Sequence, residues 1–330
     1  MWASLTKHWF LISLGACFSV GYFASEHLQS LRDMTWLRDS VVFTVMWMMG
    51  VTLRPDTIRK SMTRPVPSML AIAINVLVVP LLCLPTMWLL RADYFGGLFV
   101  AAIVPCTLAS ASVWTRKADG DDSIAMMTTV VTNLACLAVV PIGIWLVLAQ
   151  QADIEVTRQV KKLAILVVLP LMLAQIMRRM GISSWADRNK SRISLFGQSG
   201  ILAMVVFGAV ASASTVDVAT PVAETNPSGW FAIVPLLIAA IMVHVFALWF
   251  GIAAARGLRM NRASQIAVGI AGSQKTLMVG LQIAIDCGVS VVPMLVYHLS
   301  QLVIDTMVAD RWKIAGLQET ETQTTDSLEN

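Results

Sequence analysis

Charged side chains are scarce in this sequence, and their scarcity excludes a water-soluble domain. Only 13% of the 330 residues are Asp, Glu, Lys or Arg, whereas 57% are hydrophobic. A soluble domain has about 25% charged residues, because charged groups cover much of its surface. We therefore expect an integral membrane protein whose main surroundings are the lipid bilayer.

Cysteine is also sparse, and the usual enzyme motifs are missing. The five cysteines occur singly, without CxxC or CxxH spacing, so neither a disulfide framework nor a metal site is expected. The sequence has no HExxH, GxSxG, Walker or GxGxxG motif, and its four histidines lie far apart. We therefore expect no enzymatic activity, no resident cofactor and no nucleic-acid partner.

Long apolar runs alternate with short polar gaps along the whole chain. Most runs reach the roughly 20 residues that a membrane-spanning helix needs. The pattern predicts an all-helical membrane protein of ten spans, near residues 9–24, 36–53, 66–89, 94–115, 122–149, 161–178, 195–215, 229–254, 263–285 and 289–309.

Basic residues gather in alternate gaps between these runs. If the amino terminus is cytoplasmic, the inner gaps contain 17 of the 24 Lys and Arg residues. The positive-inside rule then predicts a multi-pass protein of the cell (inner) membrane with both termini in the cytoplasm. Residues 311–330 are polar and are expected to form a disordered cytoplasmic tail. The first run could instead be a signal peptide, but its removal would leave nine spans and disturb this alternation.

The fourth and ninth runs are interrupted by polar residues together with Pro or Gly. The fourth contains VPCTLASASVWT, in which four hydroxyl residues follow Pro105, and the ninth contains GIAGSQKTLMVG. Each is the fourth member of a group of five, which predicts inverted five-plus-five repeats (about 1–155 and 156–310) within one transmembrane domain, 1–310. We expect these two helices to be discontinuous and to cross near the midplane, where free N–H and C=O groups bind ions. Close helix packing is the alternative explanation for the small residues.

Lys275 lies inside the ninth apolar run. At 1.5 Å per residue it is roughly 20 Å from Arg262 and roughly 16 Å from Asp286, which flank that run, so its side chain cannot reach either membrane surface. A charge facing lipid costs at least ~2.5 kcal/mol. Lys275 should therefore face the protein interior or water. The alternative is a lysine that only fixes packing, held by backbone carbonyls or a buried acid.

Other polar residues are expected to line the same site. Thr129 and Asn133 lie four residues apart in the fifth run and so share a helix face, although Asn133 could instead bond a neighbouring helix. His298 lies at a corresponding depth in the tenth run, whereas His244 is better explained as a packing histidine. The predicted substrate-binding residues are Lys275, Thr107, Ser110, Asn133 and His298.

Two segments, ASASVWTRKADGDDSIAMMTTVVTNLACLAVVP and GSQKTLMVGLQIA, resemble the bile acid:sodium symporter superfamily, most closely its divergent SBF-like branch. The resemblance implies that the fourth and ninth spans unwind and cross, with two sodium ions bound behind the crossing. Ser112, Thr129 and Gln274 match positions that supply sodium ligands in sodium-coupled members. Two positions differ, since an acidic residue of the family is here Ile270 and an asparagine is here Lys275. Replacing an anion by a cation weakens sodium binding, because like charges a few ångström apart repel.

These features together predict a secondary active transporter of a small organic anion that works by alternating access. By the resemblance, spans three to five and eight to ten form a core, and spans one, two, six and seven form a moving panel. The coupling ion is sodium or a proton, since the ammonium of Lys275 could stand in for a bound cation and a buried lysine could also release a proton. The alternative is a non-transporting membrane protein that affects ion handling in a partner. The sequence names no protein partner.

Overall fold

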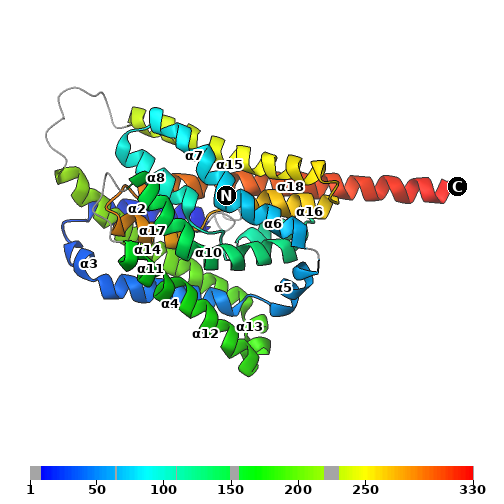
Figure 1. Ribbon diagram of the computed structural model, residues 1–330, viewed down its shortest axis with the longest axis horizontal. Coiled ribbons are helices and arrows are strands. Elements are labelled where there is room, and N and C mark those ends of the chain that lie inside the picture. Colours follow the sequence, from blue (N-terminus) through cyan, green and yellow to red (C-terminus); the bar gives the residue numbers. More distant parts are fainter. Residues whose placement is uncertain (1–8, 64, 109, 149–155, 219–229, 330) are drawn as a thin grey trace.

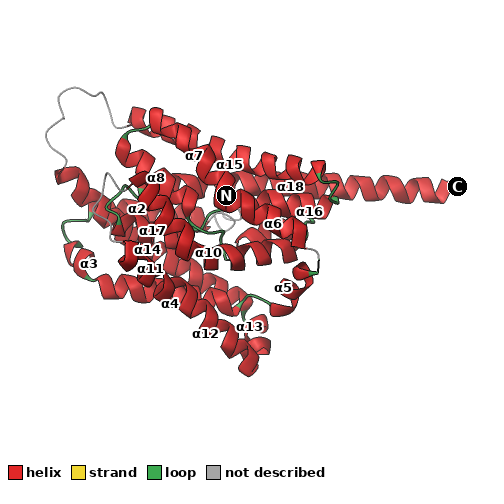
Figure 2. Cartoon of the chain, in the orientation of Figure 1, coloured by secondary structure: helices red, strands yellow, loops and turns green. Residues whose placement is uncertain are grey.

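A computed structural model describes residues 9–63, 65–108, 110–148, 156–218 and 230–329. Every regular element in these residues is a helix, and no strand occurs among them (Figure 1, Figure 2). Helices are expected here, because in a bilayer the backbone groups of a spanning segment must be bonded within the protein. The helices form one bundle, from which the carboxyl-terminal helix projects (Figure 1).

The elements of the first half follow the predicted runs and gaps. They are α2 (Trp9–Phe23), α3 (Gln29–Asp33), α4 (Thr35–Val51), α5 (Pro55–Met62), α6 (Pro65–Ala73), the π-helix η1 (Ile74–Val78), α7 (Val79–Cys83), the 3-10 helix η2 (Leu84–Trp88), α8 (Ala92–Ile103), α9 (Ser110–Lys117) and α10 (Asp122–Leu148).

The second half contains two more π-helical turns and the longest helices. Its elements are α11 (Val156–Leu163), η3 (Ala164–Val168), α12 (Leu169–Met177), η4 (Arg178–Ile182), α13 (Ser183–Arg188), α14 (Lys190–Val218), α15 (Trp230–Gly257), α16 (Arg262–Ser273), α17 (Leu277–Asp286) and α18 (Val292–Glu329).

Six helical stretches of the described residues are long and apolar enough to cross a membrane. The other four predicted spans fall on α2, on α4 and on the pairs α8–α9 and α16–α17, which are shorter or interrupted. The six stretches are Pro65–Trp88, Asp122–Leu148, Thr157–Arg188, Lys190–Ala213, Ile233–Gly257 and Val292–Ile314.

The helices pack in two groups. In one group α14 packs on α2 and α4, and α4 packs on α12. In the other, α15 packs on α16 and α18, and α16 packs on α6 and α10. Gly269 permits the close approach of α16 to α15, because a Cβ at this position would lie 2.7 Å from Ile252 Cγ1 and 3.0 Å from Leu248 O. Helix α17 contacts both groups, through α4 and α14 on one side and α8 and α18 on the other.

Two helix pairs are interrupted in their middle. Helix α8 ends at Ile103, where Val104 is extended (φ −69°, ψ 158°). This conformation is the one that a following proline favours, and Pro105 also lacks the N–H that would continue the helix. Between α16 and α17, Gln274 and Thr276 are extended as well (ψ 140° and 129°). The backbone groups of both breaks therefore need partners outside their own helices.

The expectation of a disordered tail is wrong for the described residues. Helix α18 runs without interruption from Val292 to Glu329, so the backbone of the tail is helical (Figure 1). The apolar span forms the helical nucleus, and each further residue then adds one hydrogen bond without the cost of nucleation. Polarity alone therefore did not predict the conformation of this segment.

Candidate functional site

Buried polar groups gather where the two helix breaks meet. The N–H of Thr276 donates to the carbonyl of Pro105 at 2.9 Å, which joins one break to the other. Ser273 and Gln274 are fully buried, and Lys275 is 1% exposed. Buried polar groups lose water on folding, so each needs a partner inside the protein.

The ammonium of Lys275 is surrounded by oxygen atoms from two other segments. Its Nζ donates to Asn75 O at 2.6 Å, to Asn75 Oδ1 at 3.2 Å and to Val104 O at 3.0 Å. Three acceptors match the three protons of an ammonium group. Lys275 therefore faces the protein interior, as predicted.

Asn75 was not identified from the sequence, yet it binds the break between α16 and α17. Its Nδ2 lies within hydrogen-bond distance of the carbonyls of Ala271, Gly272 and Gln274, at 3.4, 3.2 and 2.9 Å, where α16 leaves its last carbonyls without helical partners. The local sequence explains why Asn75 O is free. In the π-helical turn Val79 N–H bonds Ile74 O, five residues back, and the next donor in that series is Pro80, which has no N–H.

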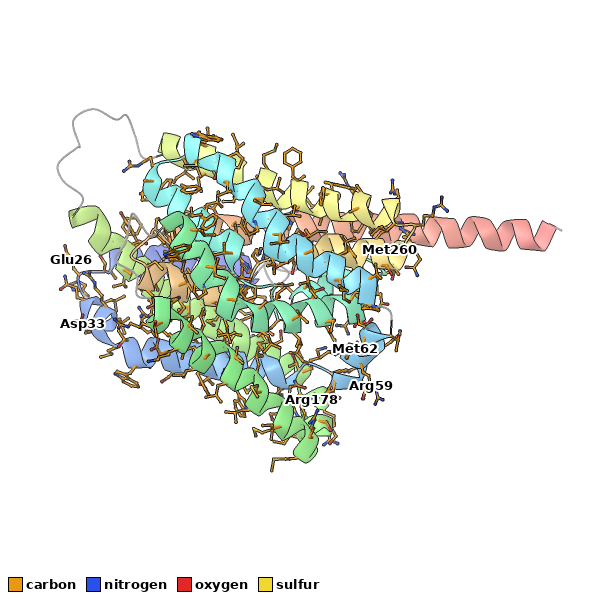
Figure 3. The ribbon with its side chains drawn as sticks, in the orientation of Figure 1. Glu26, Asp33, Arg59, Met62, Arg178 and Met260 are labelled. Carbon is orange, nitrogen blue, oxygen red and sulfur yellow. The ribbon has the colours of Figure 1, made fainter. Side chains whose placement is uncertain are left out.

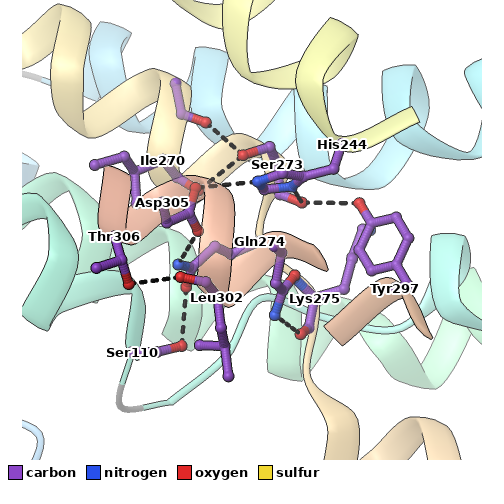
Figure 4. Close-up of polar contacts among 12 residues, drawn as sticks. Ser110, His244, Ile270, Ser273, Gln274, Lys275, Tyr297, Leu302, Asp305 and Thr306 are labelled. Atoms are coloured by element: carbon purple, nitrogen blue, oxygen red, sulfur yellow. Dashed lines mark hydrogen bonds and ion pairs between the residues drawn. The ribbon is translucent and has the colours of Figure 1, made fainter. Parts of the chain in front are cut away.

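Gln274 connects the break to a buried acid that the sequence analysis also missed. Its Nε2 donates to Asp305 Oδ2, and its Oε1 accepts from Ser110 Oγ at 3.0 Å (Figure 4). Asp305 on α18 is fully buried and its Oδ1 lies 3.0 Å from His244 Nε2. An acidic residue inside the tenth apolar run was a detectable signal, because intramembrane carboxylates are rare and usually functional.

His244 lies between two oxygen acceptors. Besides Asp305 Oδ1, its ring contacts Ser273 O, which is 3.4 Å from Nδ1 and also accepts from Tyr297 Oη at 3.1 Å (Figure 4). The ring therefore bridges the carboxylate of Asp305 on α18 and the carbonyl of Ser273 at the end of α16.

The candidates on the first break bond one another or its backbone. Ser110 Oγ lies 3.0 Å from Thr107 Oγ1, and Thr129 Oγ1 donates to Thr107 O at 3.0 Å. Asn133 Nδ2 donates to Cys106 O at 3.0 Å, while its buried Oδ1 has no partner among the described residues. These side chains fix the extended segment after α8. Asn133 Oδ1 remains beside it as a buried acceptor.

Ser112 and His298 lie at the edges of this arrangement. Ser112 Oγ accepts from Arg116 one turn further along α9, at 3.3 Å, and shares no hydrogen bond with Thr129 or Gln274. The three residues matched to sodium ligands thus have separate partners. His298 Nδ1 lies 2.8 Å from Gln301 Nε2, and Gln301 bonds both the N–H and the carbonyl of Lys275.

Three proteins that resemble this chain carry the names of transporters. It is 26% identical over 225 residues to the Escherichia coli (strain K12) protein named "Putative symporter YfeH", covering 66% of this chain and 65% of that protein. It is 24% identical to "Probable sodium/metabolite cotransporter BASS4, chloroplastic" of Oryza sativa subsp. indica, over 67% of this chain and 55% of that protein. It is 23% identical to sodium/bile acid cotransporter 7 of Danio rerio, over 71% and 68% of the two chains.

The matched region thus spans less than two thirds of the first two of these relatives. None of the three names describes an enzyme. The sequence profile of the SBF-like CPA transporter family matches residues 8–314, which is most of the chain. The resemblance inferred from the two interrupted segments is confirmed: the chain belongs to the SBF-like CPA transporter family, within the bile acid:sodium symporter superfamily.

Proposed function

We propose that this protein is a secondary active transporter that moves a small organic anion by alternating access and is coupled to protons rather than to sodium. The proposed architecture is ten spans in inverted five-plus-five repeats, in which the pairs α8–α9 and α16–α17 are discontinuous spans that cross. The two packing groups, with α17 between them, support a core and a panel that move against each other.

The observation that carries the proposal is the oxygen cluster around Lys275. A sodium ion would need oxygen ligands of this kind, but here the acceptors Asn75 O, Asn75 Oδ1 and Val104 O surround an ammonium group. Gln274, matched to a sodium ligand, is engaged by Ser110 and Asp305. A second cation a few ångström away would be repelled, so a tethered cation serves in place of sodium.

The His244–Asp305 pair supplies the exchangeable proton in this proposal. With its proton the pair is neutral, and the crossing carries the single positive charge of Lys275. Without it the pair is negative and cancels Lys275, because Gln274 alone separates Lys275 from the Asp305 hydrogen bond. Proton binding thus favours an anion at the crossing, where the amino termini of α9 and α17 also favour negative charge. The two ligands then bind cooperatively, as symport requires.

The test uses purified protein in liposomes that contain a pH-sensitive dye. A panel of small carboxylates is added outside, in sodium and in choline medium of equal ionic strength. We expect carboxylate-dependent acidification of the lumen that is the same in both media. The variant Asp305→Asn, which cannot hold the proton, should lose this signal.

Protein-free liposomes provide the control for diffusion of the neutral acids. A strict sodium requirement would contradict proton coupling and restore the symport mode named for the relatives. No uptake of any carboxylate in either medium, with protein that is folded by thermal unfolding, would favour the alternative of a non-transporting protein.

A further inference from the structure

A second group of charged residues joins α4 and α11 to α17. Arg38 and Asp39 belong to α4, Lys162 to α11, and Gln282 and Asp286 to α17. Arg38 Nη2 and Lys162 Nζ both bind the carboxylate of Asp286 at 2.8 Å. Lys162 also reaches Asp39 at 3.3 Å, and Gln282 Nε2 donates to Asp39 at 3.2 Å and to Asp286 at 2.9 Å. We refer to these five residues as the α4–α17 network.

The Arg38–Asp286 pair of the network is largely shielded from solvent, whereas the side chain of Asp39 is 32% exposed. The side chains of Arg38 and Asp286 are 9% and 13% exposed, and that of Lys162 is 23% exposed. Charged hydrogen bonds in such surroundings are stronger than those of exposed surface pairs, which contribute little. Asp286 is moreover the last residue of α17, where the helix dipole disfavours a negative charge. The two cations therefore hold Asp286 at a position that its own helix does not favour.

The network lies at the end of the bundle that is expected to face outward. Asp33, just before α4, and Met260, just before α16, lie at opposite ends (Figure 3). Because α16 and α17 lead away from Met260, Asp286 lies at the end near Asp33. The gaps at this end contain few basic residues, which predicts the outer side.

Arg38 has capacity for a further anion. Its Nε is a buried donor with no hydrogen-bond partner among the described residues. A cavity of about 240 Å³ adjoins Arg38 and is also lined by Arg32 and by Gly288, which follows α17. Two arginines beside one cavity favour a carboxylate, because the planar guanidinium binds carboxylates through paired hydrogen bonds.

We propose that the α4–α17 network is the outer gate of the transporter, and that Asp286 occupies an anion-recruiting site formed by Arg38 and Lys162. When α17 moves away from α4 and α11, Asp286 leaves, the outer crevice opens, and the two cations attract the carboxylate of an incoming organic anion. The chain's own carboxylate thus competes with the external anion. This inference rests on the proposed transport of an organic anion and adds where that anion first binds.

A native cysteine beside the network allows a test that needs no known substrate. Cys287 is buried, free and adjacent to Asp286. Intact cells are treated with two membrane-impermeant methanethiosulfonates, one with a sulfonate and one with a quaternary ammonium, and labelling of Cys287 is measured. In Asp286→Asn we expect both rates to rise by about tenfold, the effect of ~1.4 kcal/mol on the opening equilibrium. The anionic reagent should gain a further preference of about tenfold from the exposed cations.

Three further variants make the outcome specific. Adding Arg38→Gln to Asp286→Asn should keep labelling fast but remove the preference for the anionic reagent. Asp93→Asn removes a carboxylate that pairs with Arg91 at 3.4 Å within one segment and does not join α4 to α17, so labelling should not change. Cys287→Ser gives the background from the other cysteines.

Unchanged labelling in Asp286→Asn would overturn the inference. It would also be overturned if labelling rises but the preference for the anionic reagent remains after Arg38→Gln is added. If Asp286→Asn does not reach the membrane, Lys162→Gln opens the same network more weakly and should give a smaller rise of the same kind. Labelling does not depend on uptake. If the liposome assay shows no uptake but labelling changes as expected, the proposed transport is contradicted and the gate is not. If uptake occurs but labelling does not change as expected, the gate alone is contradicted.

Discussion

Lys275 has no carboxylate among its hydrogen-bond partners, although its side chain is buried. All three acceptors of its Nζ are uncharged oxygens, two from the backbone and one from a side-chain amide. Removing an ammonium from water is costly, and only well-directed partners offset this cost. The acceptors would in turn be unsatisfied without it. The residue and its surroundings therefore stabilise the crossing as a unit.

We expect Lys275→Asn to lose both thermal stability and transport. The shorter amide cannot reach both Asn75 O and Val104 O, and each buried carbonyl left without a partner costs about 1–3 kcal/mol. Lys275→Gln should behave in the same way. Lys275→Arg keeps the charge but not the compact shape, and should not restore either property. The measurements are the melting temperature in detergent and uptake in liposomes.

The matched control is Lys117→Asn. Lys117 pairs with Asp310 at 2.6 Å and lies over the Trp114 ring, but its side chain is 31% exposed. An exposed pair contributes about 0–1 kcal/mol, so this variant should melt close to the unchanged protein. Wild-type stability and uptake in Lys275→Asn would remove Lys275 from the mechanism.

The site residues that the sequence revealed were those that are unusual in an apolar run. Lys275 was identified as an interior lysine because a charge at that depth is costly in lipid. Asp305 carried the same signal and was overlooked. Asn75, an amide among apolar neighbours in the third run, carried a weaker form of this signal, but its role also depends on a π-helical turn, on Pro80 and on a contact between residues 200 positions apart.

Helix α16 has an asparagine bonded to each of its ends, and the two act in opposite senses. At the amino terminus, Asn261 accepts from Ser264 N–H through Oδ1 at 2.9 Å. At the carboxyl terminus, Asn75 donates through Nδ2 to the last carbonyls. The helix dipole is positive at the first end and negative at the second. The same substitution should therefore have different effects at the two positions.

We expect Asn75→Asp to destabilise the protein and Asn261→Asp to leave it unchanged or slightly more stable. Aspartate at 75 has no amide donor for the last carbonyls of α16, which costs about 1–3 kcal/mol for each group left unsatisfied, and its ion pair with Lys275 Nζ, which lies 3.2 Å from Asn75 Oδ1, offsets only part of this loss. Aspartate at 261 still accepts the capping bond and gains about 0.3–1 kcal/mol from the dipole. Melting temperatures of the two variants provide the comparison. Equal losses would show that Asn75 does not act through its donor.

Element positions were predicted better than element shapes. Six of the ten apolar runs coincide with helices long enough to span a membrane, and the other four fall on helices that are shorter or interrupted. The π-helical turns before Pro80 and Pro170 were not predicted, and neither was the helical tail. These depend on local backbone hydrogen bonding and helix propagation, which hydropathy does not describe.

The whole molecule is asymmetric in charge from one end of the bundle to the other. Arg59 and Arg178 lie at the end that also contains Met260, whereas Glu26 and Asp33 lie at the opposite end (Figure 3). Basic residues next to spans are retained in the cytoplasm, while acidic ones have little effect on orientation. This asymmetry is the physical basis for placing the α4–α17 network outside.

Single cysteines at the two ends test this orientation directly. In Asp33→Cys the new thiol should react with a membrane-impermeant maleimide added to intact cells. In Met260→Cys it should react only after the membrane is permeabilised, because the basic gap that contains Met260 is expected inside. The unchanged protein, with its five native cysteines, gives the background. The reverse pattern would place the α4–α17 network on the cytoplasmic side. The same ion pairs would then close the inner rather than the outer crevice. Arg38 and Lys162 would in that case bind an anion that leaves the cell.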